Sequence, residues 1–241
     1  KYGGSGYTDY REMIDSGKIN FVVVATPNSL HFEQAKYALE NGCDVLVEKP
    51  VSLNPKEVHL LSEIAEKNNT NAYTVLQVRL NPTVKSIKNI LSDGSLGKIR
   101  GISLVQRWQR PFEYFTGWRA EPFVGGGTLY ECGIHYMDIL CYLFGKPIVK
   151  SSTTYNTKHL NCEIEDTIYS LLDFKDYGGT LEVTISTEPS NLECSISIIT
   201  EKGYIKLGGQ DESEKNDIKN LGGLFVIGTE RMESRRVDNQ A

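Results

Sequence analysis

The sequence predicts an α/β protein of two domains, in which part of a parallel sheet is followed by a larger, mostly antiparallel open sheet. Up to Pro82, apolar β-branched runs alternate with amphipathic stretches over short links, a pattern typical of a parallel sheet with helices packed on it. Beyond Pro82, strand-length runs follow one another across hairpin-turn signals, which favours antiparallel pairing. We therefore expect domains at 1–82 and 83–209, followed by a polar, mobile segment at 210–241.

The first domain contains the strongest strand signal of the chain. Residues 21–25 form a continuous apolar run, which is typical of a strand buried on both faces of a sheet. Gly42 is expected to end the helix that follows, and Asn54 with Pro55 to begin the next one. The full set expected here is helices over 8–15 and 29–41, a helix from Asn54, and strands over 21–25, 45–47 and 72–78.

The second domain is expected to be one sheet with a long helix on one face. Residues 128–144 carry apolar side chains at helical spacing and end at Gly145, with Pro147 shortly beyond. A shorter helix is expected over 83–91, ending near Gly94. The strands expected are 99–109, 148–157, 167–174, 179–187, 194–200 and 204–207.

Charge and composition argue against several classes of protein. The 241 residues carry a net charge of -5, which argues against nucleic acid or an anionic membrane as the main partner. No apolar run approaches the roughly 20 residues of a membrane span, and no charged-then-apolar leader opens the sequence, so we expect a cytoplasmic protein. The five cysteines are scattered and odd in number, so we interpret them as small buried hydrophobes in a reducing compartment.

No metal site is expected, because no cluster of histidine, cysteine, aspartate and glutamate has metal-ligand spacing. The sequence also lacks a GxSxG nucleophile elbow and a GxxxxGK[ST] phosphate loop. Of the four histidines, His31 and His59 look like helix-surface residues and His159 like a loop residue. This leaves His135 as the histidine with a candidate chemical role.

His135 lies on the long predicted helix, shortly after the glycine triplet at 125–127. Glu131 is four residues before it and Asp138 three after, so the three side chains share a helix face. An acidic neighbour would fix the tautomer of a general acid or base, which is the functional interpretation. The alternative is a hydrogen-bonded packing histidine, and the residues by themselves favour neither.

Lys49 is the second candidate for chemistry. It follows the predicted strand at 45–47 and precedes Pro50, which restricts Lys49 to extended conformations. A lysine at the carboxyl edge of a strand and a helix-borne histidine form a plausible proton-handling pair. The alternative is an ordinary surface ion pair, for which Glu48 is the adjacent acid.

Further candidates lie in turns and in an aromatic stretch. The turn from Thr26 to Asn28 follows a strand, where open parallel sheets bind ligands, and capping of the next helix is the alternative. Arg79 and Asn81 suit an anionic or hydroxyl-rich substrate, although Asn81 with Pro82 also reads as a simple turn. Arginines and aromatics mix between residues 107 and 119 in a way that suits a sugar or nucleotide pocket, or a subunit contact. The residues concerned are Arg107, Trp108, Arg110, Tyr114, Trp118 and Arg119.

With these motifs in sequence order, the chain resembles the Gfo/Idh/MocA family of nicotinamide-dependent oxidoreductases, which pair a Rossmann domain with an α/β domain built on an open sheet. The match covers residues 8–208. It rests on the strand and turn Phe-Val-Val-Val-Ala-Thr-Pro-Asn, on Glu-Lys-Pro, and on Gly-Gly-Gly before Gly-Ile-His-Tyr-x-Asp. Residues 77–82 and the pair Trp118 and Arg119 look most like members that oxidise nucleotide sugars, of the UDP-N-acetylglucosamine or -glucosaminuronate 3-dehydrogenase type.

The resemblance implies roles for the matching residues. Lys49 would hydrogen-bond the reacting hydroxyl, and His135 would be the acid/base. The residues expected at the cofactor, NAD or NADP, are Thr26, Pro27, Asn28, His31, Glu48, Lys49 and Gln77. The residues expected at the substrate, a sugar or nucleotide sugar, are Arg79, Asn81, Trp118, Arg119, Glu131 and Asp138. We also expect a homo-oligomer formed through the open sheet, because an exposed sheet face usually needs covering.

The chain departs from the family pattern at three places. Glu131 stands where an aspartate or asparagine is more usual. Family members open with a strand and a GxGxxG turn, a unit of roughly 30 residues, whereas only twenty residues precede Phe21, and Gly3-Gly4-Ser5-Gly6 follows no strand signal. The family's C-terminal return segment is not recognisable after Gly208. We expect a truncated or partial member of an enzyme family.

The leading hypothesis is therefore oxidation of a secondary alcohol on a sugar. Hydride would pass to NAD(P)+ while His135 takes the hydroxyl proton and Lys49 stabilises the developing alkoxide. The alternative is a non-catalytic module that binds sugar nucleotides or serves assembly and has lost its cofactor site. The residues leave the choice between NAD and NADP, the sugar and its oxidised carbon open.

Overall fold

The structure is a computed structural model that describes residues 3–209 and 224–228. The chain divides into two compact units. The first unit contains residues 1–75 and 121–126, and the second contains residues 76–120 and 127–241. Each unit has its own hydrophobic core.

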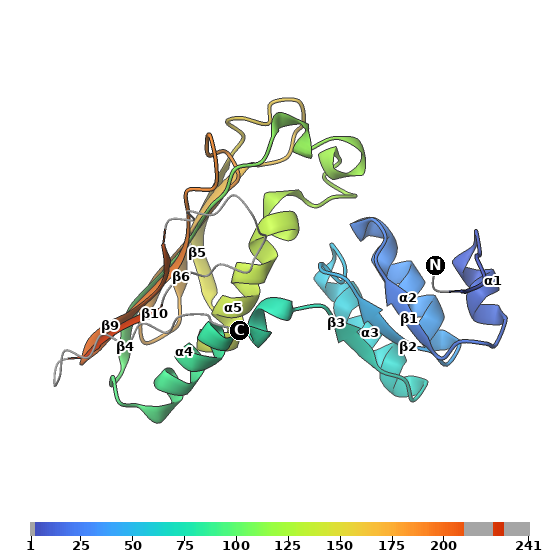
Figure 1. The fold of residues 1–241 in the computed structure, drawn as a ribbon, viewed down its shortest axis with the longest axis horizontal. Coiled ribbons are helices and arrows are strands. Elements are labelled where there is room, and N and C mark those ends of the chain that lie inside the picture. The colour runs from blue at the N-terminus through green and yellow to red at the C-terminus, as the bar shows by residue number, and fades with distance from the viewer. Residues whose placement is uncertain (1–2, 210–223, 229–241) are drawn as a thin grey trace. The chain divides into compact units, whose positions relative to one another are not determined.

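The first unit is built on a three-stranded parallel sheet, as predicted (Figure 1). Its strands, in spatial order, are β1 (Phe21–Val24), β2 (Asp44–Val47) and β3 (Ala72–Thr74). The helices of this unit are α1 (Tyr10–Asp15), α2 (His31–Glu40) and α3 (Pro55–Lys67). The Asn54 side chain accepts the Lys56 N–H at 3.1 Å, so the predicted start of α3 is confirmed.

The prediction that 21–25 is buried on both faces is wrong. Val22 and Val24 are buried, whereas Phe21 is 46% and Val23 60% exposed. Within the described residues, α2 and α3 pack on one face of the sheet only, so alternate side chains of β1 stay accessible. An apolar run identifies a strand, but it does not show how many faces are covered.

The second unit is a seven-stranded sheet among the described residues. Six pairs of neighbouring strands are hydrogen-bonded, and all are antiparallel except β4 with β7. This confirms the prediction of a mostly antiparallel sheet. In spatial order the strands are β10 (Leu224–Gly228), β9 (Gly203–Gly209), β8 (Glu193–Thr200), β4 (Ile99–Arg107), β7 (Gly178–Thr184), β6 (Thr167–Asp173) and β5 (Ile148–Tyr155). The sequence pattern predicted no strand at the position of β10. The rest of the segment 210–241 lies outside the described residues.

Two helices lie along one face of this sheet, α4 (Pro82–Asp93) and α5 (Ile134–Phe144) (Figure 1). The predicted single helix at 128–144 opens instead with a π-helical turn, Leu129–Gly133, before α5 begins. Gly133 allows close packing there, because a Cβ on it would lie 3.3 Å from Val183 of β7. The helix ends at Gly145, as predicted.

Two further expectations are wrong. The strand expected over 72–78 ends at Thr74, because the Arg79 N–H bonds to the Leu76 carbonyl and the chain enters a 3-10 turn. The cysteines are all free but not all buried, since Cys141 is exposed. No helix of the described residues has the length and apolarity needed to cross a membrane.

Candidate functional site

In the first unit, the candidate residues lie in the turns that leave the carboxyl ends of β1 and β2. Thr26 is exposed, whereas Asn28 is 4% exposed. The Asn28 side-chain amide donates to the Gly125 carbonyl at 2.8 Å, which ties the first glycine of the triplet to this turn. Open parallel sheets bind ligands at such strand ends.

His31 is the first residue of α2, and its predicted surface position is wrong. It is 1% exposed. Its Nδ1 lies 2.7 Å from the Pro50 carbonyl oxygen and its Nε2 lies 2.7 Å from the Thr26 carbonyl oxygen. Both ring nitrogens therefore contact backbone, and the ring connects the turn after β1 to the loop after β2.

Lys49 and Glu48 follow β2, and both side chains are half-buried. The Glu48 N–H donates to the Val24 carbonyl at 2.9 Å, which extends the β1–β2 ladder by one step. The Lys49 N–H lies 3.3 Å from the Glu48 carboxylate. The backbone of Lys49 is thus fixed at the strand end, where the sequence predicted it.

In the second unit, the candidate residues centre on the helix that carries His135. His135 is 4% exposed and Glu131 is 8% exposed. The Arg119 Nε lies 3.4 Å from the Glu131 carboxylate. Buried carboxylates are costly unless they are paired, so Arg119 helps to hold Glu131 one turn before His135.

Asp138, one turn after His135, is held by a second arginine. Arg79 Nε donates to one oxygen of Asp138 at 2.8 Å, and its Nη2 donates to the other. Arg79 also lies over the Tyr142 ring, 5.2 Å from its centre. The hydrogen bonds to Asp138 raise the pKa of Arg79. Both acids on the helix face are therefore ion-paired to arginines from other segments.

The aromatic residues singled out in the sequence gather near the start of this helix. The guanidinium of Arg119 lies 4.3 Å from the Trp118 ring centre and 5.6 Å from that of Tyr114. Arg110 lies 4.8 Å from Trp108 and also 5.6 Å from Tyr114. The structure thus brings together five of the six residues of that stretch. Arg107 lies elsewhere, paired with Glu182 and Glu193 on the sheet.

Glu165 lies beside the glycine triplet, although the sequence pattern did not indicate it. Its carboxylate lies beside Gly127, in the space that a Cβ would occupy, and 3.5 Å from the Leu129 N–H. Burial raises the pKa of the Glu165 carboxyl, although backbone N–H groups oppose the shift. Glu165 therefore contacts the last glycine of the triplet and the first turn of the helix. No local pattern marks it, because the contact spans 36 residues.

Two predicted site residues remain, Asn81 and Gln77. Asn81 caps α4, since its side-chain oxygen accepts the Thr83 N–H at 2.9 Å. Gln77 is exposed at the start of the 3-10 turn, within the second unit. Among the described residues, no group of three histidine, cysteine or acidic side chains is placed to hold a metal ion.

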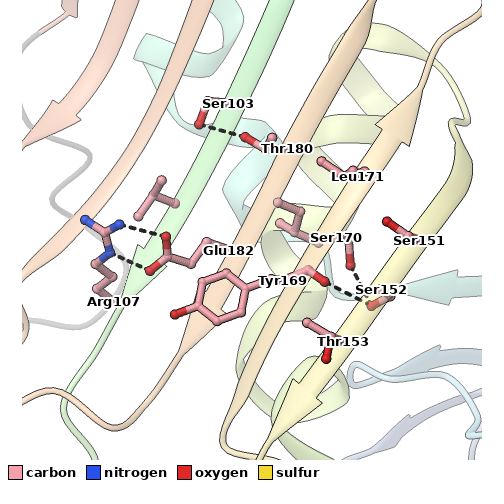
Figure 2. Close-up of a pocket in the computed structure, with 12 residues that line it drawn as sticks. Ser103, Arg107, Ser151, Ser152, Thr153, Tyr169, Ser170, Leu171, Thr180 and Glu182 are labelled. Carbon is pink, nitrogen blue, oxygen red and sulfur yellow. Dashed lines mark hydrogen bonds and ion pairs between the residues drawn. The ribbon is translucent and has the colours of Figure 1, made fainter.

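The outer face of the large sheet carries a shallow hollow of about 530 Å³ (Figure 2). Figure 2 shows its polar and aromatic lining on neighbouring strands, with Glu182 paired to Arg107 and Ser152 bonded to Ser170. Tyr169 and Leu171, both in the lining, are 44% and 54% exposed. This face is distinct from the one that α5 covers, because the alternate residues of these strands point to opposite sides.

The first unit fits part of a dinucleotide site. The strand-end turns after β1 and β2, with their buried Asn28 and His31, supply the edge at which such cofactors bind. Residues 3–20 contain no described strand, so within them the structure describes no strand-linked glycine turn of the kind that receives a pyrophosphate.

Two family models cover most of the chain. The model described as oxidoreductase family, NAD-binding Rossmann fold, matches residues 1–76, and the GFO/IDH/MocA C-terminal domain matches residues 84–206. The chain therefore belongs to the Gfo/Idh/MocA family of oxidoreductases. The fold class and the nicotinamide type of cofactor are confirmed at the level of the family. A SecA P-loop domain model also matches residues 176–241, although no GxxxxGK[ST] loop occurs there.

Characterised relatives are sugar and polyol dehydrogenases. Scyllo-inositol 2-dehydrogenase (NADP(+)) IolW of Bacillus subtilis is 28% identical over 178 residues, 72% of this chain and 49% of the relative. D-glucoside 3-dehydrogenase of Escherichia coli is 26% identical over 200 residues, 75% of this chain and 56% of the relative. The chain thus spans about half the length of these curated relatives.

Solved structures resemble the chain closely in fold. The WlbA dehydrogenase of Bordetella pertussis, in complex with NADH and UDP-GlcNAcA, has a TM-score of 0.81 at 28% identity, covering 88% of this chain and 64% of its own. The WlbA dehydrogenase of Chromobacterium violaceum, with the same two ligands, also has a TM-score of 0.81 at 30% identity, covering 85% and 60%.

Proposed function

We propose that this chain is part of an NAD(P)-dependent dehydrogenase that oxidises a secondary alcohol on a sugar, and that the sugar is a nucleotide sugar oxidised at its 3-position. Family membership and the two WlbA structures support this proposal. The observation that carries it is the buried His135 between two acids, each ion-paired to an arginine. A buried imidazole one helical turn from each of two acids suits general acid–base chemistry.

The residues of the chain have distinct tasks in this reaction. His135 takes the proton from the substrate hydroxyl as the carbonyl forms, and Lys49 is the hydrogen-bond donor for the negative charge that develops. The nicotinamide dinucleotide, when bound, accepts the hydride. Thr26, Pro27 and Asn28 shape the strand-end turn toward the cofactor, and Asn28 does so through its bond to Gly125.

The cluster near the start of the helix suits recognition of the nucleotide sugar. Trp118 and Tyr114 offer aromatic faces, and Arg119 and Arg110 bring two guanidinium groups to them. Sugar and base rings stack on such faces, and phosphate or carboxylate oxygens accept from guanidinium N–H groups. A neutral polyol would use the aromatic faces alone.

Single substitutions in the full-length protein test the assignment. Lys49→Ala and His135→Ala should each lower the turnover of UDP-GlcNAcA with NAD+ or NADP+ by at least about 100-fold, the lower end of general acid–base contributions. Lys56→Ala and His59→Ala are matched controls, because both residues are exposed on α3, and they should turn over as the wild type does. Wild-type rates in either site variant would remove that residue from the mechanism.

Cofactor binding separates the enzyme from a non-catalytic module. NADH fluorescence should change on adding the full-length protein, with or without the His135 substitution. Binding of UDP-GlcNAcA without any response to NADH or NADPH would instead support the sugar-nucleotide-binding module and overturn the dehydrogenase.

We also propose that the outer face of the large sheet is the interface of a homo-oligomer. Exposed Tyr155, Tyr169 and Leu171 provide apolar area there. The same face carries both signs of charge, in the Arg107–Glu182 and Lys150–Asp173 pairs. A face with both signs and central apolar side chains is able to pair with a second copy of itself about a two-fold axis.

A further inference from the structure

His31 is a buried imidazole held between two hydrogen-bond acceptors. Its two ring nitrogens each lie 2.7 Å from a backbone carbonyl oxygen, one of Pro50 and one of Thr26. A carbonyl oxygen only accepts, and a neutral imidazole has one N–H, so a neutral ring satisfies one carbonyl and directs a nitrogen lone pair at the other. At 1% exposure no bulk water compensates for that contact.

We infer that His31 carries a proton on both ring nitrogens and acts as a positioning residue that fixes Lys49 relative to the cofactor turn. Both contacts are 2.7 Å long, at the short end of the range for N–H···O hydrogen bonds, so each ring nitrogen lies at full hydrogen-bonding distance from an acceptor. Thr26 lies two residues beyond β1, and Pro50 directly follows Lys49. The imidazolium therefore joins the two turns at the carboxyl edge of neighbouring strands. The inference rests on the proposed role of Lys49.

The surroundings of the ring contain both opposing and supporting charges. No carboxylate of the described residues forms an ion pair with His31. The charged residues on the segments that meet there are Glu33 on α2, Glu48 and Lys49 after β2, and Glu121 in the segment that Asn28 holds. The positive end of α2 opposes a cation, and Glu33 in its first turn offsets that end.

The bridge made by His31 differs from ordinary packing because it ties two functional turns rather than two core elements. The strands themselves are held by backbone hydrogen bonds that continue past their ends, such as the bond from the Glu48 N–H to the Val24 carbonyl. Beyond them, the Lys49 backbone N–H donates to the Glu48 carboxylate, and His31 holds the carbonyl of the next residue, Pro50. Losing the ring bond should therefore move Lys49 while leaving the sheet intact.

Imidazole NMR tests the protonation state without any activity. In the full-length protein labelled with ¹⁵N-histidine, the His31 signals are assigned by their loss in His31→Gln, and His59→Gln provides the exposed control. Near neutral pH we expect hydrogens on both ring nitrogens of His31, protected from exchange with water. A hydrogen on only one ring nitrogen would overturn the inference.

A double-mutant cycle tests positioning separately. His31→Gln should lower kcat for UDP-GlcNAcA oxidation by at least about 10-fold, and in the Lys49→Met background it should lower kcat by less than about 2-fold, because residues that act as a unit are not additive. Full additivity would show that His31 acts through folding alone and would overturn its role. If no variant and no wild type turns over substrate, the proposed function fails, while the NMR result on His31 stands by itself.

Discussion

Replacing Gln106 with methionine should stabilise the second unit. Gln106 lies in β4 and is fully buried, and neither atom of its amide has a hydrogen-bond partner among the described residues. Its cross-strand neighbours are Val183 and Cys194. Leaving a buried donor or acceptor unpaired costs about 1–3 kcal/mol, and an apolar group of the same shape removes that cost. Methionine is unbranched like glutamine, so we expect a gain of about 1–3 kcal/mol in the free energy of unfolding.

Tryptophan fluorescence during thermal unfolding measures this effect. Both tryptophans of the chain, Trp108 and Trp118, belong to the second unit, so the signal reports that unit. Each kcal/mol should raise the midpoint by about 2–4 °C in a domain of this size. The control is Gln109→Met, at a half-buried position nearby, which should change stability by less than about 0.5 kcal/mol. A midpoint lowered by more than about 3 °C in Gln106→Met would refute the reasoning, because the amide would then have partners that the substitution removed.

Two further predictions concern acid stability and assembly. Burial alone would raise the pKa of the Asp166 carboxyl, but the N–H groups of Lys158 and His159 outweigh it and lower that pKa to about 2. The stability that this carboxylate contributes, about 2 kcal/mol, is thus complete above the ordinary pKa of 3.8 and is lost as pH falls through about 2. Asp166→Asn should therefore make the free energy of unfolding less dependent on pH over that range. Equal pH dependence in the variant and the wild type would contradict this. Leu171→Arg should dissociate the oligomer in sedimentation, whereas Leu160→Arg, at another exposed leucine, should not; a monomeric wild type at micromolar concentration would remove the proposed interface.

Much of the fold is predictable from the sequence because hydrophobic periodicity and the residues that begin and end helices are local features. The Asn54 cap and the Gly145 stop need only neighbouring residues to act, and both lie where the pattern placed them. The errors arise where a distant element decides the outcome. The exposure of Val23 depends on which sheet faces are covered, and the close approach of Val183 to Gly133 in the π-helical turn brings together segments far apart in the sequence. Neither quantity is encoded in a local run of residues.

The candidate site also has features that local sequence predicts and features that depend on distant segments. Spacing alone predicts that Glu131, His135 and Asp138 share a helix face. Their partners come from other segments: the Arg119 contact spans 12 residues and the Arg79 contact spans 59. His31 illustrates the same limit, since its helical spacing suggested an exposed residue, and only the fold brings the Thr26 and Pro50 carbonyls to its ring.

The arginine pairs also decide which cation is free to recognise a charged substrate. Asp138 has a side chain only 11% exposed, so withdrawing Arg79 toward a substrate would leave a nearly buried carboxylate unpaired. Glu131 constrains Arg119 in the same way. Arg110 is different, because among the described residues it pairs with no carboxylate, and its guanidinium donates to the Gln109 carbonyl at 2.8 Å. A guanidinium has five N–H donors. Arg110 can therefore bind a phosphate or carboxylate without breaking an existing ion pair, so under the proposed function we expect it to contribute to the recognition of an anionic sugar.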